Sequence, residues 1–347
     1  MCHPPHSPSV SFGQADECGL GDCVAVFTTC APVSPPRECA LLADDVKLSS
    51  WLQAARPLAH ANIAVPLLVG EVLGWAATGE WDLRLVALTH AAAVLDQLFI
   101  VFANDVADEA SDRENDDATM FSGGSRVLVE GKISPTALRR ASWLAAVALL
   151  GLAAVMALGL ARPLLFPLWV LGVALLWAYS YPPLRLSYRG YGEVAQGLGL
   201  GVVLPVIGYY TVTGSLDGLS WQPLVPLFVL GFAGNINTAL PDARADAATD
   251  KRSWPVRYGL SRARKHTLQL LALATFMTPF ILPGVPKSTW FSVEVGPAVV
   301  LLLAALTWRD ADPDDRRACV RFVFLCGLAL NVLMLGWCGA LWIHATV

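Results

Sequence analysis

The sequence predicts an all-α membrane protein, a bundle of about nine transmembrane helices around a central cavity. Hydrophobic residues make up 55% of its 347 residues and charged residues only 15%, whereas soluble domains carry about 25% charged residues. Windows of about 19 residues identify about nine segments apolar enough to span a bilayer. The formal net charge of −4 says little by itself, but the positions of the charges are informative.

Each predicted span has the length that a bilayer requires, because about 20 apolar residues in a helix cross its hydrocarbon core. The predicted spans are 57–77, 83–103, 141–161, 163–183, 192–213, 221–241, 267–284, 290–308 and 320–343.

The basic residues predict the orientation of the bundle. Of the 24 Lys and Arg residues, all but Arg84, Arg162 and Lys287 fall in the N-terminal segment or in the loops after every second span. Loops rich in Lys and Arg stay in the cytoplasm. We therefore expect a multi-pass protein with a cytoplasmic N-terminus and a C-terminus on the opposite side.

Residues 1–50 are rich in Pro, Ser and Cys and contain no apolar run of helical length. They lack a basic n-region followed by an apolar h-region, so we predict neither a signal peptide nor a span there. We expect a disordered cytosolic tail, followed by one transmembrane domain over residues 51–347. The five cysteines of the tail match no zinc-binding spacing and are expected to be reduced thiols.

An acidic cluster follows the second span. Asn104, Asp105, Asp108 and Asp112 come directly after the apolar run 83–103. In a helix, residues four positions apart stay on nearly the same face, so the side chains at 104, 108 and 112 can share one target. Hard divalent cations prefer such oxygen ligands.

A second acidic cluster has the same spacing after the sixth span. Asp242, Asp246 and Asp250 are four residues apart and are followed directly by Lys251 and Arg252. Both clusters belong to the predicted cytoplasmic side. Two facing clusters of this kind suggest two Mg²⁺ ions that hold one polyanion.

Asp96 continues the first cluster into the membrane. It lies eight residues before Asn104, which places it about 12 Å deeper along the same helix. It is either a structural carboxylic acid that bonds to a neighbouring helix or a group in the central cavity. The sequence leaves both interpretations open.

The loop after the first cluster carries candidate phosphate ligands. Gly123 and Gly124 permit close backbone approach, and Arg126 and Lys132 can meet phosphate oxygens. A solvated cytoplasmic loop would explain the same bases. Ser134, which precedes a proline, has the pattern of a helix N-cap.

Polar and aromatic side chains near the other span ends are further candidates. Asn62, in the first span, is expected to face the interior of the bundle. Tyr179 and Tyr181 either belong to an aromatic belt at the membrane interface or reach the mouth of the cavity. The last three spans carry no ionisable pattern and are expected to serve packing and to face lipid.

These motifs together resemble the UbiA superfamily of intramembrane aromatic prenyltransferases over about residues 50 to 345. The family's first motif, Asn-Asp-x-x-Asp-x-x-x-Asp, is met at 104–112 and its second, Asp-x-x-x-Asp-x-x-x-Asp, at 242–250. The segment 250–259 is similar to a stretch of 1,4-dihydroxy-2-naphthoate prenyltransferases, with Asp250 in place of their Gly. Arg56-Pro57 at the start of the first span adds to the resemblance.

The sequence differs from the naphthoate enzymes at two places, and both differences concern which acceptor is used. Val106-Ala107 stands where naphthoate enzymes often carry an aromatic pair inside the first motif. Asn237-Thr-Ala-Leu-Pro241 stands where they carry Asn-Asn-x-Arg.

The resemblance implies Mg²⁺-dependent transfer of a prenyl group from an allylic diphosphate to an aromatic or other lipid-soluble acceptor within the membrane. Membrane lipids are the expected surroundings, and no nucleic-acid partner is expected. The implied metal ligands are Asn104, Asp105, Asp108, Asp112, Asp242, Asp246 and Asp250. The implied substrate-binding residues are Arg56, Asn62, Arg126, Lys132, Tyr179, Tyr181, Lys251 and Arg252. The catalytic candidates are Asp108, Asp246 and, outside the family motifs, Asp96.

Three other functions are alternatives to prenyl transfer. A terpene cyclase on the same fold would use the substrate's own double bond instead of an acceptor, and the motifs do not distinguish it. A divalent-cation transporter would place its carboxylates near the bilayer midplane, whereas these clusters lie at span ends. A non-catalytic lipid-binding scaffold would have no use for two complete metal sites.

Overall fold

The computed structural model describes residues 47–115, 118–119, 122–281, 285–309 and 315–345. Regular structure in these residues is helical, apart from one isolated bridge between Thr119 and Ser122. The helices are α1 (Leu48–Ala55), η2 (Pro57–His60), α2 (Ala61–Thr78), α3 (Leu83–Ala107), α4 (Glu109–Glu114), α5 (Pro135–Gly159), α6 (Leu165–Ser180), α7 (Leu186–Arg189), α8 (Gly192–Leu198), η3 (Gly199–Val203), α9 (Leu204–Thr213), α10 (Leu224–Ala239), α11 (Ala243–Ala248), α12 (Trp254–Tyr258), α13 (Leu260–Phe276), α14 (Thr278–Ile281), α15 (Lys287–Arg309) and α16 (Arg316–Ala345).

The predicted tail lies outside the described residues as far as residue 46. The described chain begins at Lys47 and enters α1 at Leu48. The tail and the boundary at residue 50 therefore stay predictions.

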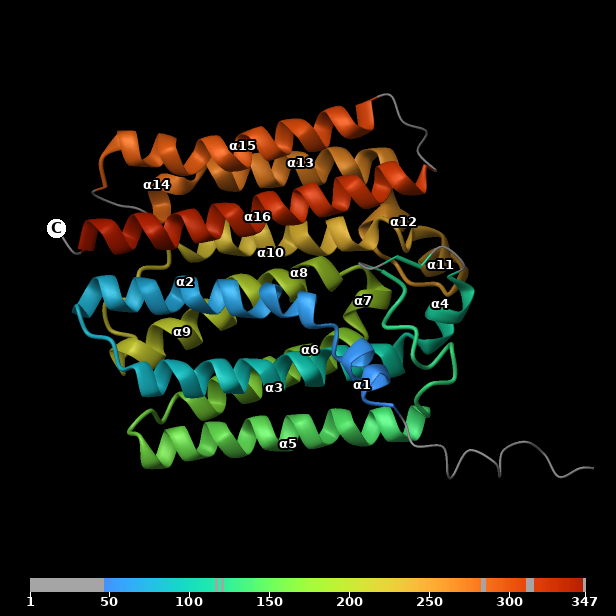
Figure 1. Ribbon diagram of the computed structural model, residues 1–347, viewed down its shortest axis with the longest axis horizontal. Helices are drawn as coiled ribbons and strands as arrows, with labels where there is room; N and C mark the ends of the chain where they lie inside the picture. The colour runs from blue at the N-terminus through green and yellow to red at the C-terminus, as the bar shows by residue number, and fades with distance from the viewer. Residues whose placement is uncertain (1–46, 116–117, 120–121, 282–284, 310–314, 346–347) are drawn as a thin grey trace, which may run out of the picture. The chain divides into compact units, whose positions relative to one another are not determined.

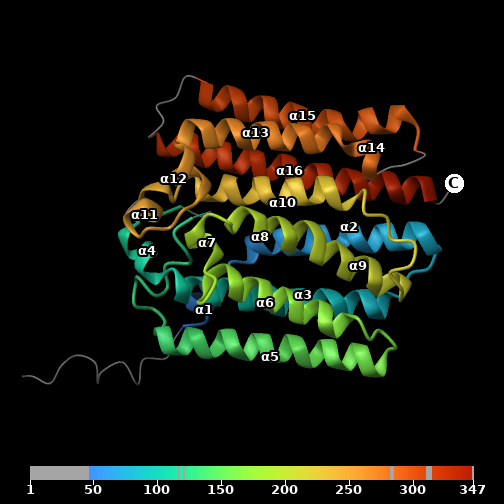
Figure 2. The same cartoon turned by 180° about the vertical axis from the view of Figure 1, so that it is seen from behind.

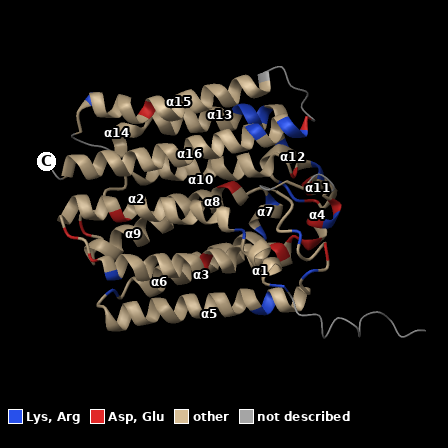
Figure 3. Ribbon diagram, in the orientation of Figure 1, with Lys and Arg blue, Asp and Glu red and all other residues tan. Residues whose placement is uncertain are grey.

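The long helices run side by side, alternately up and down, between two ends of one bundle (Figures 1 and 2). The short helices α1, α4, α7, α11 and α12 gather at one end, whereas α16 ends at the other. Most of the coloured Lys, Arg, Asp and Glu residues lie at the end with the short helices (Figure 3). Both acidic motifs thus share one end, opposite the end of α16. Which side of a membrane this end faces stays a prediction.

Six helical segments are long and apolar enough to cross a membrane: Leu48–Thr78, Leu83–Ala107, Pro135–Gly159, Gly192–Thr213, Lys287–Trp308 and Arg316–Ala345. The shorter apolar helices are α6 and α10. Helix α13 belongs to neither group, because Arg262, Arg264 and Lys265 occupy its first turns. Each predicted span overlaps a helix of the described chain, although 267–284 crosses the break between α13 and α14 and ends outside the described residues. The number nine stays a prediction.

Close helix contacts form where glycine removes a side chain. A Cβ atom added to Gly208 of α9 would lie 2.2 Å from the backbone oxygen of Leu67 in α2. One added to Gly201, in the π-helical turn η3, would lie 2.3 Å from the backbone nitrogen of Phe228 in α10. These contacts pack α9 closely against α2, and η3 closely against α10.

Helix starts follow the local sequence. The Ser134 side chain accepts a hydrogen bond from the backbone N–H of Ala137 at 3.2 Å, which confirms the predicted N-cap of α5. Asp82 caps α3 in the same way, with Oδ1 2.9 Å from the backbone nitrogen of Arg84. Both side chains satisfy N–H groups that a helix start leaves unpaired.

Candidate active site

A cavity of about 880 Å³ opens at the charged end of the bundle and extends between the long helices. Its mouth is lined by Asp108, Asp246 and Lys251, and its apolar part by residues such as Trp169 of α6 and Ile207 of α9. A chamber of this kind can hold a molecule with a charged head and an apolar tail.

The first motif spans two helices rather than one. Helix α3 ends at Ala107, Asp108 occupies its C-cap position, and Asp112 lies in the separate helix α4. The expectation of a single helical stripe from 96 to 112 is therefore wrong beyond Asp108. The backbone N–H of Asp112 still donates to the oxygen of Asp108 at 2.8 Å, so the break is small and both carboxylates line the cavity.

Asp105 is buried beneath the glycine-containing loop. The backbone N–H of Ser125 donates to Oδ1 of Asp105 at 3.2 Å, and the Ser125 hydroxyl donates to Oδ2 of the same carboxylate. The guanidinium of Arg56 lies 3.9 Å from the same Oδ1. A Cβ atom added to Gly124 would lie 2.0 Å from Oδ2 of Asp112. Glycine at 124 thus lets the loop close over both carboxylates.

The second motif is shorter than predicted. Asp242 precedes α11 and Asp246 lies within it, and both line the cavity. Helix α11 ends at Ala248, and Asp250 then adopts a left-handed conformation with φ of 60°. Its side chain is exposed and outside the cavity lining. The structure therefore does not bring Asp250 to the other ligands, because the helical repeat stops before it.

Lys251 joins the two motifs. Its Nζ lies 2.9 Å from Oδ2 of Asp108 and 3.7 Å from Oδ1 of Asp246. Burial by itself would lower the pKa of the Lys251 amine. The carboxylates of Asp108 and Asp246 outweigh this effect and raise that pKa well above its ordinary value. Lys251 therefore stays charged between the two motifs.

The negative charge of the carboxylates around Lys251 is not fully neutralised by nearby positive groups. Burial, followed by the nearby carboxylates of Asp105 and Asp108, raises the pKa of Asp112 to about 8. Burial and the charge of Asp246 raise the pKa of Asp242 to about 7. Like charges gathered in a buried site have this effect, and a bound cation would relieve it.

The donor set fits a hard divalent cation. All candidate ligands offer carboxylate or amide oxygen, which Mg²⁺ prefers over nitrogen or sulfur, and the Gly124 loop leaves Asp112 room. Among the described residues, no three acidic, histidine or cysteine side chains already converge on one point. Because Mg²⁺ usually keeps several water ligands and uses only one or two carboxylates, the cluster provides enough ligands.

The predicted substrate-binding residues divide into two groups. Arg56, Asn62, Arg126 and Tyr179 line the cavity together with Lys251. Arg126 also donates to the backbone oxygens of Asp112 and Asn115, and so fixes the loop that carries the first motif.

Three predicted substrate ligands lie outside the cavity lining. Lys132 is exposed and pairs with Glu130 at 2.5 Å. The Tyr181 hydroxyl donates to the Ala103 oxygen at 2.8 Å. Arg252 follows the turn at Asp250 and is exposed. The ion pair with Glu130, the hydrogen bond to Ala103 and the turn at Asp250 direct these three side chains away from the cavity. None of these contacts forms a recognisable sequence motif.

Asp96 lines the cavity below the motifs. Its side chain is 5% exposed, and no hydrogen bond to it is observed within the described chain. This favours a cavity role over a structural bond to a neighbouring helix. Its neighbour Gln97 lines the same cavity.

The motifs did not identify several contacts in the site. The hydroxyl of Tyr188 donates to Oδ1 of Asp108 at 3.2 Å, and that of Ser180 to Oδ1 of Asn104 at 2.5 Å. The Asn115 amide donates to Oδ1 of Asp242 at 2.7 Å. Helix α16, expected only to pack and face lipid, contributes Asn331 to the lining. A lone amide inside an apolar span was the available signal.

The sequence model of the UbiA prenyltransferase family matches residues 63–342. The chain belongs to the UbiA prenyltransferase family. The resemblance predicted from the two aspartate motifs is confirmed, and the protein is a membrane-embedded prenyltransferase.

Two enzymes with similar sequences are a naphthoate octaprenyltransferase and a naphthoquinone phytyltransferase. The 1,4-dihydroxy-2-naphthoate octaprenyltransferase of Mycobacterium tuberculosis is 26% identical over 294 residues, which cover 84% of this chain and 97% of the relative. The 2-carboxy-1,4-naphthoquinone phytyltransferase of Synechocystis is 27% identical over 271 residues, covering 74% and 79%.

The solved structure of a UbiA homologue from Archaeoglobus fulgidus, bound to DMAPP and Mg²⁺, shares the fold. Its TM-score is 0.61 at 18% identity, and the match covers 83% of this chain and 98% of that one.

Proposed function

We propose that this UbiA family member transfers a prenyl group from an allylic prenyl diphosphate to an aromatic, quinone-precursor-like acceptor. One observation carries the proposal: the cavity joins a head of buried carboxylates and Lys251 to an apolar chamber between the helices. The naphthoate enzymes among the relatives support an aromatic acceptor.

The diphosphate would lie at the mouth of the cavity. Mg²⁺ would be held by Asn104, Asp105, Asp108, Asp112, Asp242 and Asp246, and the proposed number of ions is two. A homologue solved with Mg²⁺ supports the identity of the metal. When bound, the metal would supply positive charge to the leaving diphosphate. Arg56 and Arg126, which line the mouth, would meet the phosphate oxygens.

Lys251 would act on the same leaving group. The allylic carbon–oxygen bond breaks, and its electron pair stays on the diphosphate. An ammonium held between Asp108 and Asp246 is fixed in place before this charge develops, and preorganised charge lowers the barrier most.

The prenyl carbon would react deeper in the chamber. A ring carbon of the acceptor donates the electron pair of the new carbon–carbon bond, and the ring then loses one proton. Asp96, on the cavity wall two turns below Asn104, would accept that proton. The apolar walls exclude water from the allylic cation.

The direct test is an assay of the purified full-length protein in nanodiscs. Prenyl diphosphates of several chain lengths would be supplied with Mg²⁺, with and without 1,4-dihydroxy-2-naphthoate, and the products identified by mass spectrometry. We expect a prenylated aromatic product only when the acceptor is present. A cyclic hydrocarbon or alcohol formed equally well without acceptor would establish the cyclase alternative instead.

A further inference from the structure

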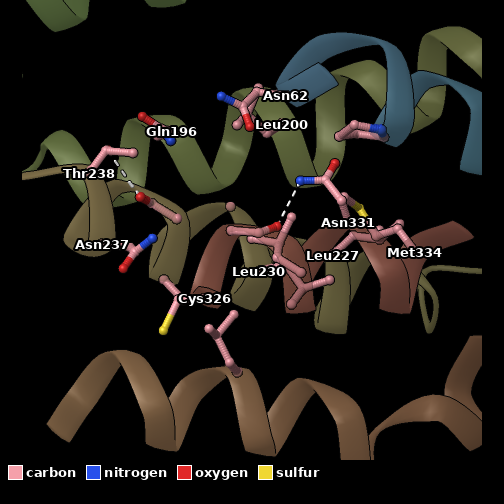
Figure 4. A pocket seen from close by; sticks show the side chains of 17 residues that line it. Asn62, Gln196, Leu200, Leu227, Leu230, Asn237, Thr238, Cys326, Asn331 and Met334 are labelled. Atoms are coloured by element: carbon pink, nitrogen blue, oxygen red, sulfur yellow. Dashed lines mark hydrogen bonds between the residues drawn. The ribbon is translucent and has the colours of Figure 1, made fainter. Parts of the chain in front are cut away.

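A side pocket of about 50 Å³ shares lining residues with the large cavity and is rich in amide side chains (Figure 4). Asn62, Gln196, Asn237 and Asn331 line both spaces. They come from α2, α8, α10 and α16, which are far apart in the sequence. Four amides facing one space inside an apolar bundle require an explanation, because polar groups within membranes are costly.

The orientation of two amides is fixed by the backbone of α16. Nδ2 of Asn237 donates to the Val323 oxygen at 2.9 Å, and Nδ2 of Asn331 donates to the Gly327 oxygen at 2.8 Å. Only the NH₂ group of an amide can bond to a carbonyl oxygen. The Oδ1 atoms of both residues are therefore left over as hydrogen-bond acceptors.

Neither oxygen has a protein partner in the described chain, although both are buried. A buried hydrogen-bond acceptor without a donor destabilises the folded protein. Two such atoms beside one cavity indicate that a molecule with hydrogen-bond donors occupies it.

Gln196 presents the opposite group. Its Oε1 accepts from Nδ2 of Asn235 at 2.7 Å, and Nδ2 of Asn235 also lies 3.2 Å from the hydroxyl of Tyr179. The NH₂ group of Gln196 is thereby left to donate. The pocket thus combines two acceptors with one donor.

The size of the pocket limits what enters it. A water molecule takes up about 30 Å³ of liquid, so a side pocket of about 50 Å³ admits a substituent but not a ring. A ring must lie in the large cavity, with its polar substituents turned toward the amides.

We propose that Asn237 and Asn331 form a subsite that accepts hydrogen bonds from the hydroxyl groups of a hydroxylated aromatic acceptor. Gln196 donates to an oxygen on the same ring. The subsite selects hydroquinone-type rings over their ethers and over rings without hydroxyls, because only a free O–H can satisfy the two oxygens. This inference rests on the proposed function, whose acceptor it specifies.

Binding to the full-length protein in nanodiscs tests the subsite. Titration calorimetry with 1,4-dihydroxy-2-naphthoate, and with its 1,4-dimethyl ether, would be done with Mg²⁺ and the unreactive geranyl S-thiolodiphosphate present. We expect the ether to bind at least about tenfold more weakly to the wild type. Asn331→Leu and Asn237→Leu should weaken binding of the hydroxylated ring by about fivefold to tenfold each, with little change for the ether.

A matched control separates recognition from loss of an intramembrane polar group. Thr275 of α13 is buried, and its hydroxyl donates to the Leu271 oxygen within its own helix, so Thr275→Val should leave both affinities unchanged. Alanine variants of both asparagines replace the leucine variants if these fail to fold, as judged by size-exclusion elution and analogue binding.

The outcomes distinguish two failures. Equal affinity for the ring and its ether, or unchanged binding in both asparagine variants, overturns the subsite and indicates that water alone bonds to the two oxygens. The subsite is also overturned if the wild-type protein binds no aromatic ring. Turnover of prenyl diphosphate without any acceptor in the product assay overturns the proposed function itself.

Discussion

The Nζ atom of Lys251 lies 2.9 Å from Oδ2 of Asp108, a residue 143 positions earlier in the chain. This ion pair joins the loop after the second motif to the end of α3 and is largely buried, with the two side chains 14% and 17% exposed. It holds a positive charge where the diphosphate would leave.

Lys251→Met should lower kcat by about 100-fold or more, because a preorganised charge at the leaving group is lost. The neighbouring Arg252 is the matched control, since it is exposed and outside the cavity lining. Arg252→Met should retain activity within about twofold, as expected for an exposed substitution. Steady-state assays with saturating acceptor measure both variants. Equal losses of kcat in the two variants would mean that the conformation of the loop, rather than the Lys251 ammonium, determines the rate.

Asp108→Asn and Asp246→Asn should abolish turnover without unfolding the bundle. Each substitution removes one carboxylate from the proposed metal cluster and one partner of Lys251, but no apolar contact of the core. Asp250→Asn is the control, because this side chain is exposed after the end of α11. Prenyl transfer would be measured over a range of Mg²⁺ concentrations. Near-normal rates in either cavity variant would contradict the metal assignment.

Gly124→Ala should reduce activity strongly, whereas Gly131→Ala should not. Both glycines have positive φ, 65° and 67°, so both substitutions carry a similar backbone cost of about 1 kcal/mol. Only the Cβ at 124 would meet Asp112, at 2.0 Å from Oδ2, whereas nothing lies within 4 Å of one at 131. The variant at 124 should therefore lose more activity and more stability than the variant at 131, as measured by turnover and thermal unfolding. Matching rates would show that the Gly124 loop can shift away.

Asp96→Asn should leave the affinity for prenyl diphosphate nearly intact and slow prenyl transfer by about 100-fold, a usual contribution of a general base. The proposed metal cluster lies two turns away along α3, and no hydrogen bond to Asp96 is observed within the described chain. Its stability should change little. If Asp96→Asn mainly lowers the unfolding temperature and leaves acceptor kinetics unchanged, the catalytic role should be dropped.

Cysteines introduced at Glu130 and Arg252 should both be labelled from the cytoplasmic side, and one at Glu80 only from the other side. All three residues are exposed, and the asymmetry of Lys and Arg predicts this orientation. A membrane-impermeant maleimide on oriented vesicles, in a cysteine-free background, provides the measurement. Labelling of positions 130 and 252 from different sides would refute the predicted topology.

The sequence by itself determined the positions of the long helices and the two acidic motifs. Hydropathy is a local property that a window of residues contains completely, so the predicted spans coincide with helices such as α3 and α15. The Ser134 cap was predictable for the same reason, because a capping residue contacts only the turn that follows it.

Only the tertiary structure decided which members of these motifs reach the cavity. A regular four-residue spacing assumes an unbroken helix, but α11 stops at Ala248 and Asp250 turns outward. The partners of Asp108, which are Tyr188 and Lys251, come from distant helices and loops. The sequence also did not reveal that Asn331 belongs to the site, because a lone amide in an apolar span lines the cavity only once α16 packs beside it. Such contacts depend on how the helices pack, which no local pattern records.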